Sequence, residues 1–452
     1  MMAEQKLAID GGAKALSDVT HAMWPIVEDE ERAAVTEVLD RGVMSGSNAP
    51  AALAFEREFA EQVGAKHALL THSGTSALQL ALAAVGVGAG DEVIIPAYSF
   101  VATAIAPLLR GALPIFVDVR PDTGNLDPEL LAGALSERTR AIMPVHVHGC
   151  PADLGAIGAF ADEHGIAVVE DAAQAHLATY DGKPVGALLG AGGFSLQSSK
   201  NLGCGEGGVF VTNDTDAYAH ANRIRNFGQD LAPADGPLDL VHPLDGGPMV
   251  SSFVGSMYRG NEMTAAFASA QLAKLPGRTR AAQDNADWLI GRLQELDGVV
   301  PPSVPEGRRS VHHKFRVGFD LEAAGLDGVD PRAFRDEMVA ALRAEGVEVV
   351  YWQTEILPGH PLFAERLCRG EGWSVPEAAL PRLRENYDPS RYPVARRILE
   401  GSIVLFSQSY PLIAQSRATV EQYASAFTKV WAARGRVAER AAERTPRRSS
   451  GT

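Results

Sequence analysis

The stretch GGFSLQSSKNLGCGEGGVFVTND, residues 192–214, places one lysine, Lys200, between two short segments that we interpret as β-strands. We predict these strands at 193–197 and 208–212, and the glycines between them indicate a tight turn. Charged residues are scarce in this stretch. Lys200 is therefore either a surface lysine on a turn, or a desolvated amine whose lowered pKa makes it a nucleophile toward a carbonyl group.

Around this stretch, short apolar runs alternate with amphipathic segments. This alternation is typical of βα units, so we predict an α/β fold with a mostly parallel central sheet flanked by helices. The clearest helices are predicted at 75–86 and 151–164. Further strands are predicted at 67–71, 92–96, 113–118, 140–145 and 166–170.

After about residue 310 the alternation starts again, which indicates a second, smaller α+β domain. Its strands are predicted within FRVGFD (315–320), VEVVYW (347–352) and IVLFS (403–407), and its helices at 331–344, at 392–400 and from 418. We predict a large domain over 1–278, a small C-terminal domain over 279–434 and a disordered, arginine-rich tail over 435–452. The segment 229–250 is dense in Pro, Gly and Asp and predicts a long loop, a feature that often borders an active site.

Composition narrows the kind of partner. The 452 residues are 46% hydrophobic and carry a formal net charge of −15. Because this charge repels phosphate backbones and anionic lipid, we predict a small-molecule substrate, with no nucleic-acid or membrane partner. Three cysteines provide neither a disulfide framework nor a cysteine-based metal site, and we predict no metal. No signal-like or bilayer-length apolar run is present, so we expect a cytoplasmic protein.

The segment ALLTHSGTSALQLAL (68–82) passes from a predicted strand directly into a predicted helix. Free amides at the start of a helix attract phosphate, and the hydroxyls of Thr75 and Ser76 beside Gly74 add donors. The alternative is an ordinary capped turn, since serine and threonine are good N-caps.

Two further strand ends carry chemically useful side chains. AVVEDAAQAH (167–176) ends a strand with Asp171, which at the carboxyl edge of a parallel sheet could pair with a cation in a ligand crevice or simply start a helix. In the same segment we interpret His176 as a packing residue. IIPAYSFVATA (94–104) supplies Tyr98 and Phe100, rings that could stack on a flat cofactor or belong to the core.

A phosphate seat, a ring, a strand-end aspartate and a lysine are the contacts that pyridoxal phosphate requires, and here they occur in that order. At these residues the sequence resembles the DegT–StrS-type sugar and cyclitol aminotransferases, a family of fold-type-I pyridoxal-phosphate enzymes. The resemblance covers roughly residues 5–433. It rests on LAIDGG, WPIVEDEERAAVTEVLDRG, FEREFAEQVGAKHALLTHSGTSALQLAL, GDEVIIPAYSFVATA, IMPVHVHG, EDAAQAH, FSLQSSKNLGCGEGG and QSYPLIAQSRATVEQYASAF.

The resemblance implies a role for each site residue. Lys200 would form the covalent imine with the cofactor, and Asp171 would pair with its ring nitrogen. Phosphate contacts would come from Gly74, Thr75, Ser76 and Ser195, ring stacking from Phe100, and a hydrogen bond to the ring hydroxyl from Gln174. It also implies a homodimer that moves an amino group from glutamate or glutamine to a keto-sugar, nucleotide keto-sugar or keto-cyclitol. A lyase or racemase on the same fold and a non-catalytic relative are the alternatives.

The sequence departs from the family pattern at two places. Met257 stands where relatives carry an asparagine that reaches the phosphate of a neighbouring subunit, although Arg259 is retained and Asn261 lies nearby. A thioether cannot donate a hydrogen bond to phosphate. In the small domain, 368–393 is an added excursion that predicts unusual acceptor specificity. There Trp352 either lines the substrate pocket or is buried, and 312–314 (HHK) either faces an anion or forms a solvated strand end.

Overall fold

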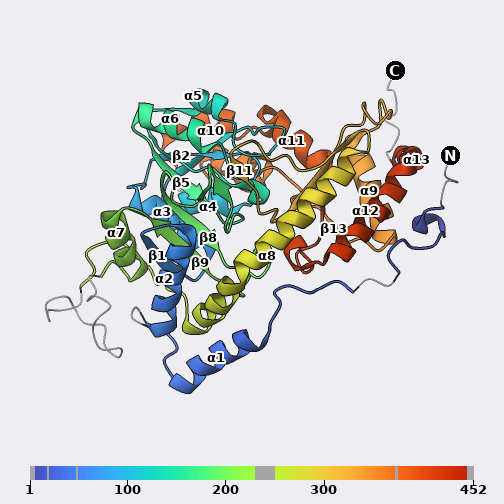
Figure 1. The fold of residues 1–452 in the computed structure, drawn as a ribbon. Helices are drawn as coiled ribbons and strands as arrows, with labels where there is room; N and C mark the ends of the chain where they lie inside the picture. The colour runs from blue at the N-terminus through green and yellow to red at the C-terminus, as the bar shows by residue number, and fades with distance from the viewer. Residues whose placement is uncertain (1–5, 18–19, 47–48, 230–249, 372–374, 445–452) are drawn as a thin grey trace.

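The computed structural model describes residues 6–17, 20–46, 49–229, 250–371 and 375–444. A seven-stranded sheet forms the centre of its larger part (Figure 1). Of these strands only β9 runs against the others, so the prediction of a mostly parallel α/β sheet is confirmed. In spatial order the strands are β1 (His67–Thr71), β9 (Gly208–Thr212), β8 (Gly190–Ser195), β5 (Ala167–Asp171), β4 (Thr139–Ile142), β2 (Glu92–Pro96) and β3 (Leu113–Val117).

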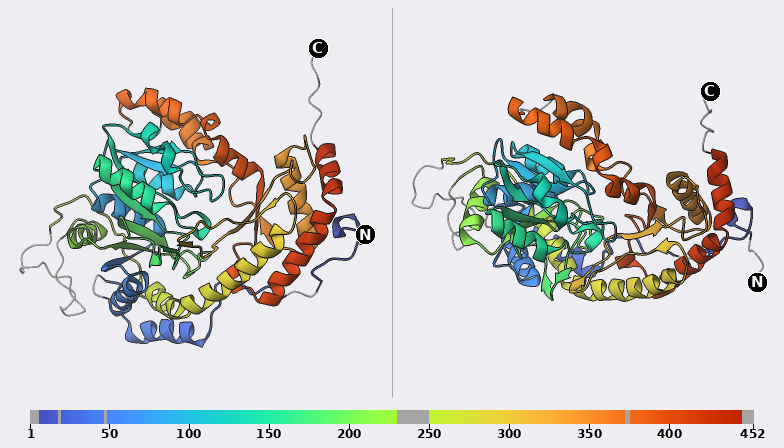
Figure 2. Two further views of the ribbon diagram at one scale, coloured as in Figure 1. Left: turned by 45° about the horizontal axis from the view of Figure 1, so that its top comes forward. Right: turned by 90° about the horizontal axis from the view of Figure 1, so that it is seen from above.

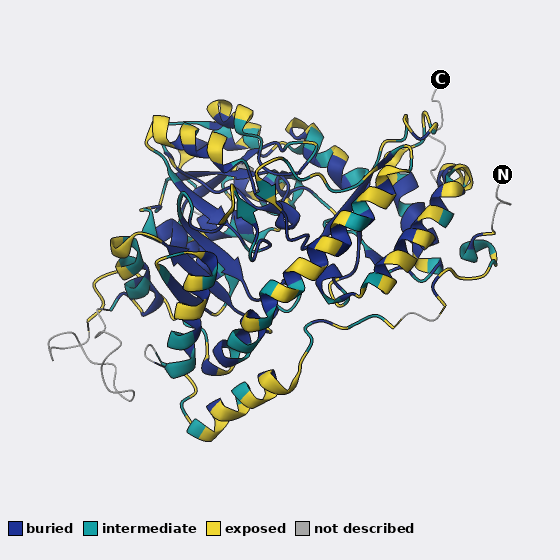
Figure 3. Cartoon of the chain, in the orientation of Figure 1, coloured by how far each residue is buried: buried dark blue, intermediate teal, exposed yellow. Residues whose placement is uncertain are grey.

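Helices cover this sheet. Its strands are almost entirely buried, whereas the helices alternate buried and exposed residues (Figure 3). Burial on both faces explains why the strands read as continuous apolar runs in the sequence. The helices of this part are α1 (Asp29–Arg41), α2 (Pro50–Val63), α3 (Gly74–Ala84), α4 (Ala102–Leu109), α5 (Leu131–Ala134), α6 (Leu154–His164) and α7 (Thr215–Arg225).

The long helix α8 (Glu262–Gln294) connects the two parts of the molecule (Figures 1 and 2). It begins at Asn261, whose side chain accepts a hydrogen bond from the Thr264 amide and so caps the helix. Its first half packs against α1 and α2, and its second half against α12 (Arg417–Ala432). The predicted domain boundary at 278/279 falls inside this helix, and the domain division stays a prediction.

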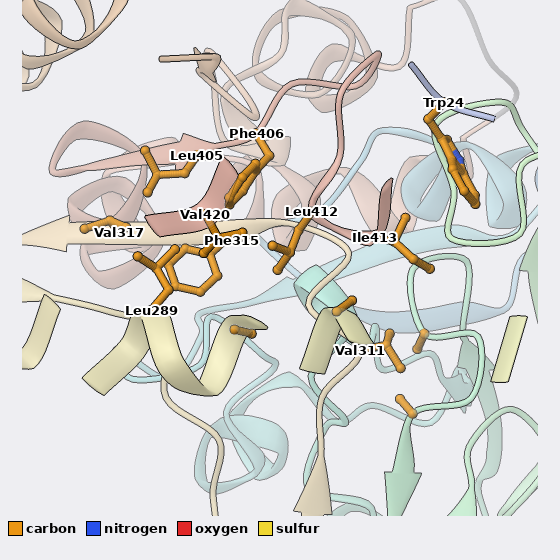
Figure 4. Close-up of a cluster of buried hydrophobic side chains, with 14 of the residues drawn as sticks. Trp24, Leu289, Val311, Phe315, Val317, Leu405, Phe406, Leu412, Ile413 and Val420 are labelled. Carbon is orange, nitrogen blue, oxygen red and sulfur yellow. The ribbon is translucent and has the colours of Figure 1, made fainter. Parts of the chain in front are cut away.

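The second part contains a four-stranded antiparallel sheet. Aromatic and aliphatic side chains from α8, the sheet and α12 fill the space between them, including Leu289, Phe315, Phe406 and Val420 (Figure 4). The sheet has the order β10 (Val299–Val300), β12 (Phe315–Phe319), β14 (Ser402–Leu405) and β13 (Val349–Val350), accompanied by α9 (Pro331–Ala344). A small three-stranded sheet joins segments from both parts. It has the order β11 (Arg308–Arg309), β6 (Thr179–Tyr180) and β7 (Lys183–Pro184).

The predicted excursion covers the edge of the large sheet. Its helix α10 (Leu380–Asn386), and α11 (Pro393–Glu400) that follows it, belong to the same hydrophobic cluster as β2 and β3. The side chain of Asn386 accepts from Phe116 N at 2.8 Å and donates to Phe116 O at 2.9 Å. It therefore pairs with the open edge of β3 as a neighbouring strand would.

The chain end differs from the prediction. Residues 435–444 are not a disordered tail, because they lie in helix α13 (Arg434–Arg444), which packs on α9. Val437, Ala438 and Ala441 are buried, and Arg440 pairs with Glu337. These three small apolar side chains are enough for the contact with α9, although in the sequence they do not form a recognisable amphipathic pattern. Residues 445–452, and 230–249 of the predicted long loop, lie outside the described residues.

Candidate active site

A cavity of about 510 Å³ lies at the carboxyl ends of the central strands. One wall comes from the large sheet, through the turns that follow β1, β2, β5 and β8. The opposite wall comes from the second part, through His313, Lys314, Trp352, Gln353 and Gln408. Seven of the eight predicted site residues line it: Gly74, Thr75, Phe100, Asp171, Gln174, Ser195 and Lys200.

The start of α3 forms one end of the cavity. Ser73 caps the helix by accepting from Ser76 N at 3.1 Å. A Cβ added at Gly74 would lie 2.8 Å from the Ser195 Cβ, so the glycine lets the helix start approach the end of β8 closely. Free helix amides and the hydroxyls of Thr75 and Ser195 therefore meet at one place, which is suited to an anion.

Ser76 is the predicted residue that is not among those lining the cavity. It is fully buried, and its hydroxyl oxygen lies 2.6 Å from the Ser73 hydroxyl and 3.2 Å from His72 Nδ1. The side chain thus stabilises the turn. Its expected phosphate contact stays a prediction.

Asp171 and Glu170 end the same strand but face opposite sides of the sheet. Asp171 lines the cavity and is only 3% exposed. Burial raises the pKa of its carboxyl group, while hydrogen bonds from Thr103 and Ala173 and the nearby Lys200 amine act against that rise. Glu170 instead accepts from the amides of 186, 188 and 189, which makes it a structural residue.

Thr103 was not predicted as a site residue. Its hydroxyl donates to Asp171 Oδ2 at 2.8 Å, and its oxygen lies 2.8 Å from the Ser99 hydroxyl. With the Ala173 amide, 3.2 Å from Oδ1, this contact orients both carboxylate oxygens. In the sequence, YSFVAT (98–103) gives no local sign of this contact, because Asp171 is 68 positions away.

Lys200 lies in the turn between β8 and β9 and reaches into the cavity. Burial lowers the pKa of its amine to about 8, against the opposing effect of the Asp171 carboxylate. Its backbone is also held, because the Trp24 indole donates to the Lys200 carbonyl at 2.8 Å. The reading of Lys200 as a solvated surface residue is therefore wrong, and its amine has the environment of a nucleophile.

Phe100 and Gln174 lie on the cavity wall in different environments. Phe100 is 52% exposed, so part of its side chain is open to the cavity and solvent. Gln174 is buried, and its side-chain oxygen accepts from His148 N at 2.9 Å. Only the amide NH₂ of Gln174 is therefore left to donate to a bound group.

The remaining aromatic candidates separate into packing and cavity residues. His176 lies between Phe59 and Phe194, and burial lowers its pKa to about 3, as expected of a packing histidine. Tyr98 is buried, with its hydroxyl 3.2 Å from His148 Nε2. Trp352 lies edge-on to Tyr98 at 4.9 Å and lines the cavity, which agrees with the first of its two interpretations.

The HHK segment is not a solvated strand end. His312, His313 and Lys314 are all buried, and the last two line the cavity. Sequence alone could not distinguish the two environments, because a polar segment before a strand occurs equally at a surface and at a pocket wall.

Met257 lies away from the described cavity lining and is 46% exposed. The retained Arg259 donates from Nη1 to the Asn226 side chain at 2.6 Å. The Asn261 oxygen caps α8. Neither residue is among the described residues that line the cavity of its own chain.

The donor set matches the needs of a phosphorylated aldehyde cofactor. An amine with a lowered pKa, a buried carboxylate and a helix start with free amides converge from three separate segments. This arrangement can bind a phosphate, hold a positive charge beside Asp171 and condense an aldehyde with Lys200. The cavity is large enough for the cofactor and a small substrate.

The described helices include none of the length and apolar character needed to cross a bilayer. Acidic groups that could hold a metal ion gather, within the same residues, at Glu28, Glu30 and Glu31. The Lys274 ammonium already pairs with all three. This group is remote in sequence from the cavity-lining segments.

Comparison with known proteins places the chain among aminotransferases. A sequence model described as the DegT/DnrJ/EryC1/StrS aminotransferase family matches residues 25–379. The chain is 36% identical, over 94% of its own length and 98% of the relative's, to an L-glutamine:scyllo-inosose aminotransferase of Streptomyces griseus. It is 35% identical, over 80% and 86% respectively, to a dTDP-3-amino-3,4,6-trideoxy-alpha-D-glucose transaminase of Streptomyces venezuelae. The crystal structure of 3-amino-5-hydroxybenzoic acid synthase superposes with a TM-score of 0.76 at 29% identity, covering 92% of this chain and 99% of that one.

Proposed function

Because the chain belongs to the DegT/DnrJ/EryC1/StrS aminotransferase family, we propose that its cavity binds pyridoxal phosphate and transfers an amino group from L-glutamine to the ketone of a cyclitol. The relative named for glutamine and scyllo-inosose supports this choice, since it aligns over nearly its whole length. Glutamate as the donor and a keto-sugar as the acceptor are the second candidates, which the similarity to a sugar transaminase favours. Membership of this family makes a transaminase the better reading than a lyase, racemase or non-catalytic protein.

One observation carries the proposal, namely the convergence of Lys200, Asp171 and the α3 start on one cavity. When bound, pyridoxal phosphate supplies an aldehyde that condenses with amines and a ring that withdraws electrons from the bond to the departing proton. The α3 amides, Thr75 and Ser195 would hold its phosphate. Asp171, oriented by Thr103 and Ala173, would keep a proton on the ring nitrogen.

Lys200 would serve twice. Its amine would hold the cofactor through the aldehyde group. When it is not bonded to the cofactor, the amine could act as base and then as acid for the proton that moves during amino transfer, because burial lowers its pKa to about 8. The hydrogen bond from the Trp24 indole to the Lys200 carbonyl supports the backbone from which this amine would act.

We also propose that the protein is a homodimer. The described part of the chain exposes a series of large apolar side chains: Met23, Met44, Phe253, Val254, Met257 and Met263. A groove of about 950 Å³ between α1, α2 and α8 adds to this surface. Light scattering on the purified protein should give twice the chain mass, and a monomer would contradict this part of the proposal.

Borohydride trapping tests the cofactor assignment directly. Protein purified with pyridoxal phosphate is reduced with borohydride, digested and examined by mass spectrometry, and the cofactor mass should be found on Lys200. Lys200→Ala should lose transamination of scyllo-inosose with L-glutamine, whereas Lys183→Ala, which removes an exposed lysine, should retain it. Cofactor attached elsewhere, or full turnover by Lys200→Ala, would refute the proposal.

A further inference from the structure

The cavity wall contains a buried amine that the proposed reaction does not use. Lys314 is 5% exposed, and within the described residues its Nζ atom has no hydrogen-bond partner. A buried ammonium group without a partner is unfavourable, because it loses its hydration and gains no hydrogen bond in exchange. Such a group is stable only if a ligand supplies the missing partner or if the amine gives up its proton.

The backbone around Lys314 is fixed by contacts with the large part of the molecule. Val311 N donates to Gly149 O at 3.1 Å, and Lys314 N donates to His148 O at 3.4 Å. Gly149 has φ +90°, and a Cβ there would lie 2.8 Å from Val311 Cγ2. Only a glycine allows this close approach.

A second contact ties Lys314 to the reactive lysine. Asn201, the residue after Lys200, donates from Nδ2 to Val311 O at 3.1 Å. Its side-chain oxygen lies 3.2 Å from His313 Nδ1. The two lysines are therefore held at a defined separation on the same cavity, and the Lys200 amine is near enough to influence Lys314.

The charges around the cavity are unevenly distributed. Among the described lining residues, the side chains able to carry positive charge are Lys200, Lys314 and His313. Burial, followed by the charges of the two lysines, lowers the pKa of His313 well below its ordinary value, so this ring stays neutral. Of the two acids, Asp171 already receives hydrogen bonds from Thr103 and Ala173, and Glu206 is exposed.

We propose that Lys314 binds the α-carboxylate of the amino donor. This inference rests on the proposed function. A donor amino acid carries its carboxylate on the carbon that loses the proton, and that carbon must lie at Lys200. Since Lys200 itself forms the covalent link, Lys314 is the remaining cation of the described wall that can pair with the carboxylate.

A lysine suits a pocket that receives two different substrates in turn. Burial, together with the nearby Lys200 amine, lowers the pKa of Lys314 to about 7. It can therefore be charged opposite a carboxylate and neutral when an uncharged polyol occupies the same space. An arginine would remain charged in both cases.

The experiment compares two ligands on matched variants. L-Glutamine and its α-amide, which lacks the carboxylate, are titrated against the cofactor-loaded enzyme, and apparent Kd is read from the change in cofactor absorbance. Lys314→Met should bind L-glutamine roughly 10- to 100-fold more weakly than wild type, the loss expected for one charge-assisted hydrogen bond. It should bind the α-amide as wild type does, so that the two ligands become nearly equivalent.

Two further variants control the result. Lys314→Arg keeps the charge and should recover most of the preference for L-glutamine over the α-amide, and Lys183→Met should behave as wild type. Binding of the aminocyclitol product, which has no carboxylate, should be unchanged in Lys314→Met.

Each outcome separates this inference from the proposed function. If wild type traps cofactor on Lys200 and reacts with L-glutamine, but Lys314→Met retains the full preference for the carboxylate, only the role of Lys314 is wrong. An equal loss for all three ligands would mean a structural role and would also overturn it. If Lys314→Met fails to bind cofactor, wild type and Lys314→Arg decide the question. Equal apparent Kd values for L-glutamine and its α-amide in these two proteins would refute the ion pair. Absence of cofactor trapping in wild type would refute the proposed function, and this inference with it.

Discussion

The indole nitrogen of Trp24 donates a hydrogen bond to the carbonyl oxygen of Lys200 over 2.8 Å, joining residues 176 positions apart. Trp24 is buried, and the Arg278 guanidinium lies over its ring at 5.5 Å. The segment before α1 therefore contacts the loop that bears the reactive lysine and helps to hold it in place. The loop is held from outside the sheet, and its own strands β8 and β9 are not its only support.

Trp24→Phe tests this contact. The variant keeps an aromatic ring in place but leaves the Lys200 carbonyl without its donor, so the free energy of unfolding should fall by about 1 kcal/mol. Turnover should fall as well, while borohydride still attaches cofactor to Lys200. Thermal unfolding and steady-state kinetics measure the two effects. Unchanged kinetics would show that the loop holds its position without Trp24.

The pKa of Lys200 gives a prediction that needs no cofactor. In apoprotein, acetic anhydride should label Lys200 faster as pH rises through about 8, because only the neutral amine reacts. The Asp171 carboxylate raises this pKa, so Asp171→Asn should move the midpoint to lower pH. Mass spectrometry quantifies the labelling, and the exposed Lys183 serves as the reference in the same sample. A midpoint moved upward would mean that the two groups do not interact as the structure indicates.

Gly149→Ala should destabilise the junction between the two parts of the molecule. The residue has φ +90°, and the new methyl group would meet Val311 Cγ2 at 2.8 Å and His313 N at 3.0 Å. We expect the free energy of unfolding to fall by about 2 kcal/mol. Displacement of Lys314 should also lower the affinity of the enzyme for the amino donor. Gly291→Ala is the matched control, since nothing lies within 4 Å of it in α8, and it should be neutral or stabilising. Equal unfolding temperatures for the two variants would contradict the strain.

Asn386→Ala should expose the edge of β3. Both hydrogen bonds to the Phe116 backbone would be lost. The free energy of unfolding should therefore fall by about 1–2 kcal/mol, and aggregation on heating should increase. Glu385→Ala removes an exposed neighbouring side chain and should have little effect, because exposed ion pairs contribute little. Light scattering during a thermal ramp separates the two variants, and identical curves would show that the excursion does not protect the strand.

Local sequence patterns were sufficient to predict much of the fold and two central residues of the site. The strands at 67–71, 92–96 and 208–212 lie as predicted, and other boundaries differ by a few residues. Asp171 could be identified because it ends an apolar run, and Lys200 because it stands between two predicted strands in a stretch where charged residues are scarce. The functional class followed from the order of the motifs, which the family match confirms.

Other features depended on contacts between distant segments. Thr103 orients Asp171 across 68 positions of sequence, and Asn386 reaches β3 across 270. The burial of Lys314 follows from the approach of its strand to the turn at Gly149, and the helix at 434–444 exists because α9 offers it a surface. None of these has a local signal, since a polar residue looks the same in sequence whether it faces solvent or a partner.

The amino-acid sequence by itself determined the alternation of strands and helices, the glycine-rich turns, the placement of a carboxylate at one strand end and that of an amine in the turn after another strand. These depend on backbone preferences and on periodic burial, which act over a few residues. Only the tertiary structure decided which side chains share the cavity, which of them lose their solvent and how far their pKa values move. Desolvation and hydrogen bonding depend on all the atoms packed around a group, and most of those atoms come from elsewhere in the chain.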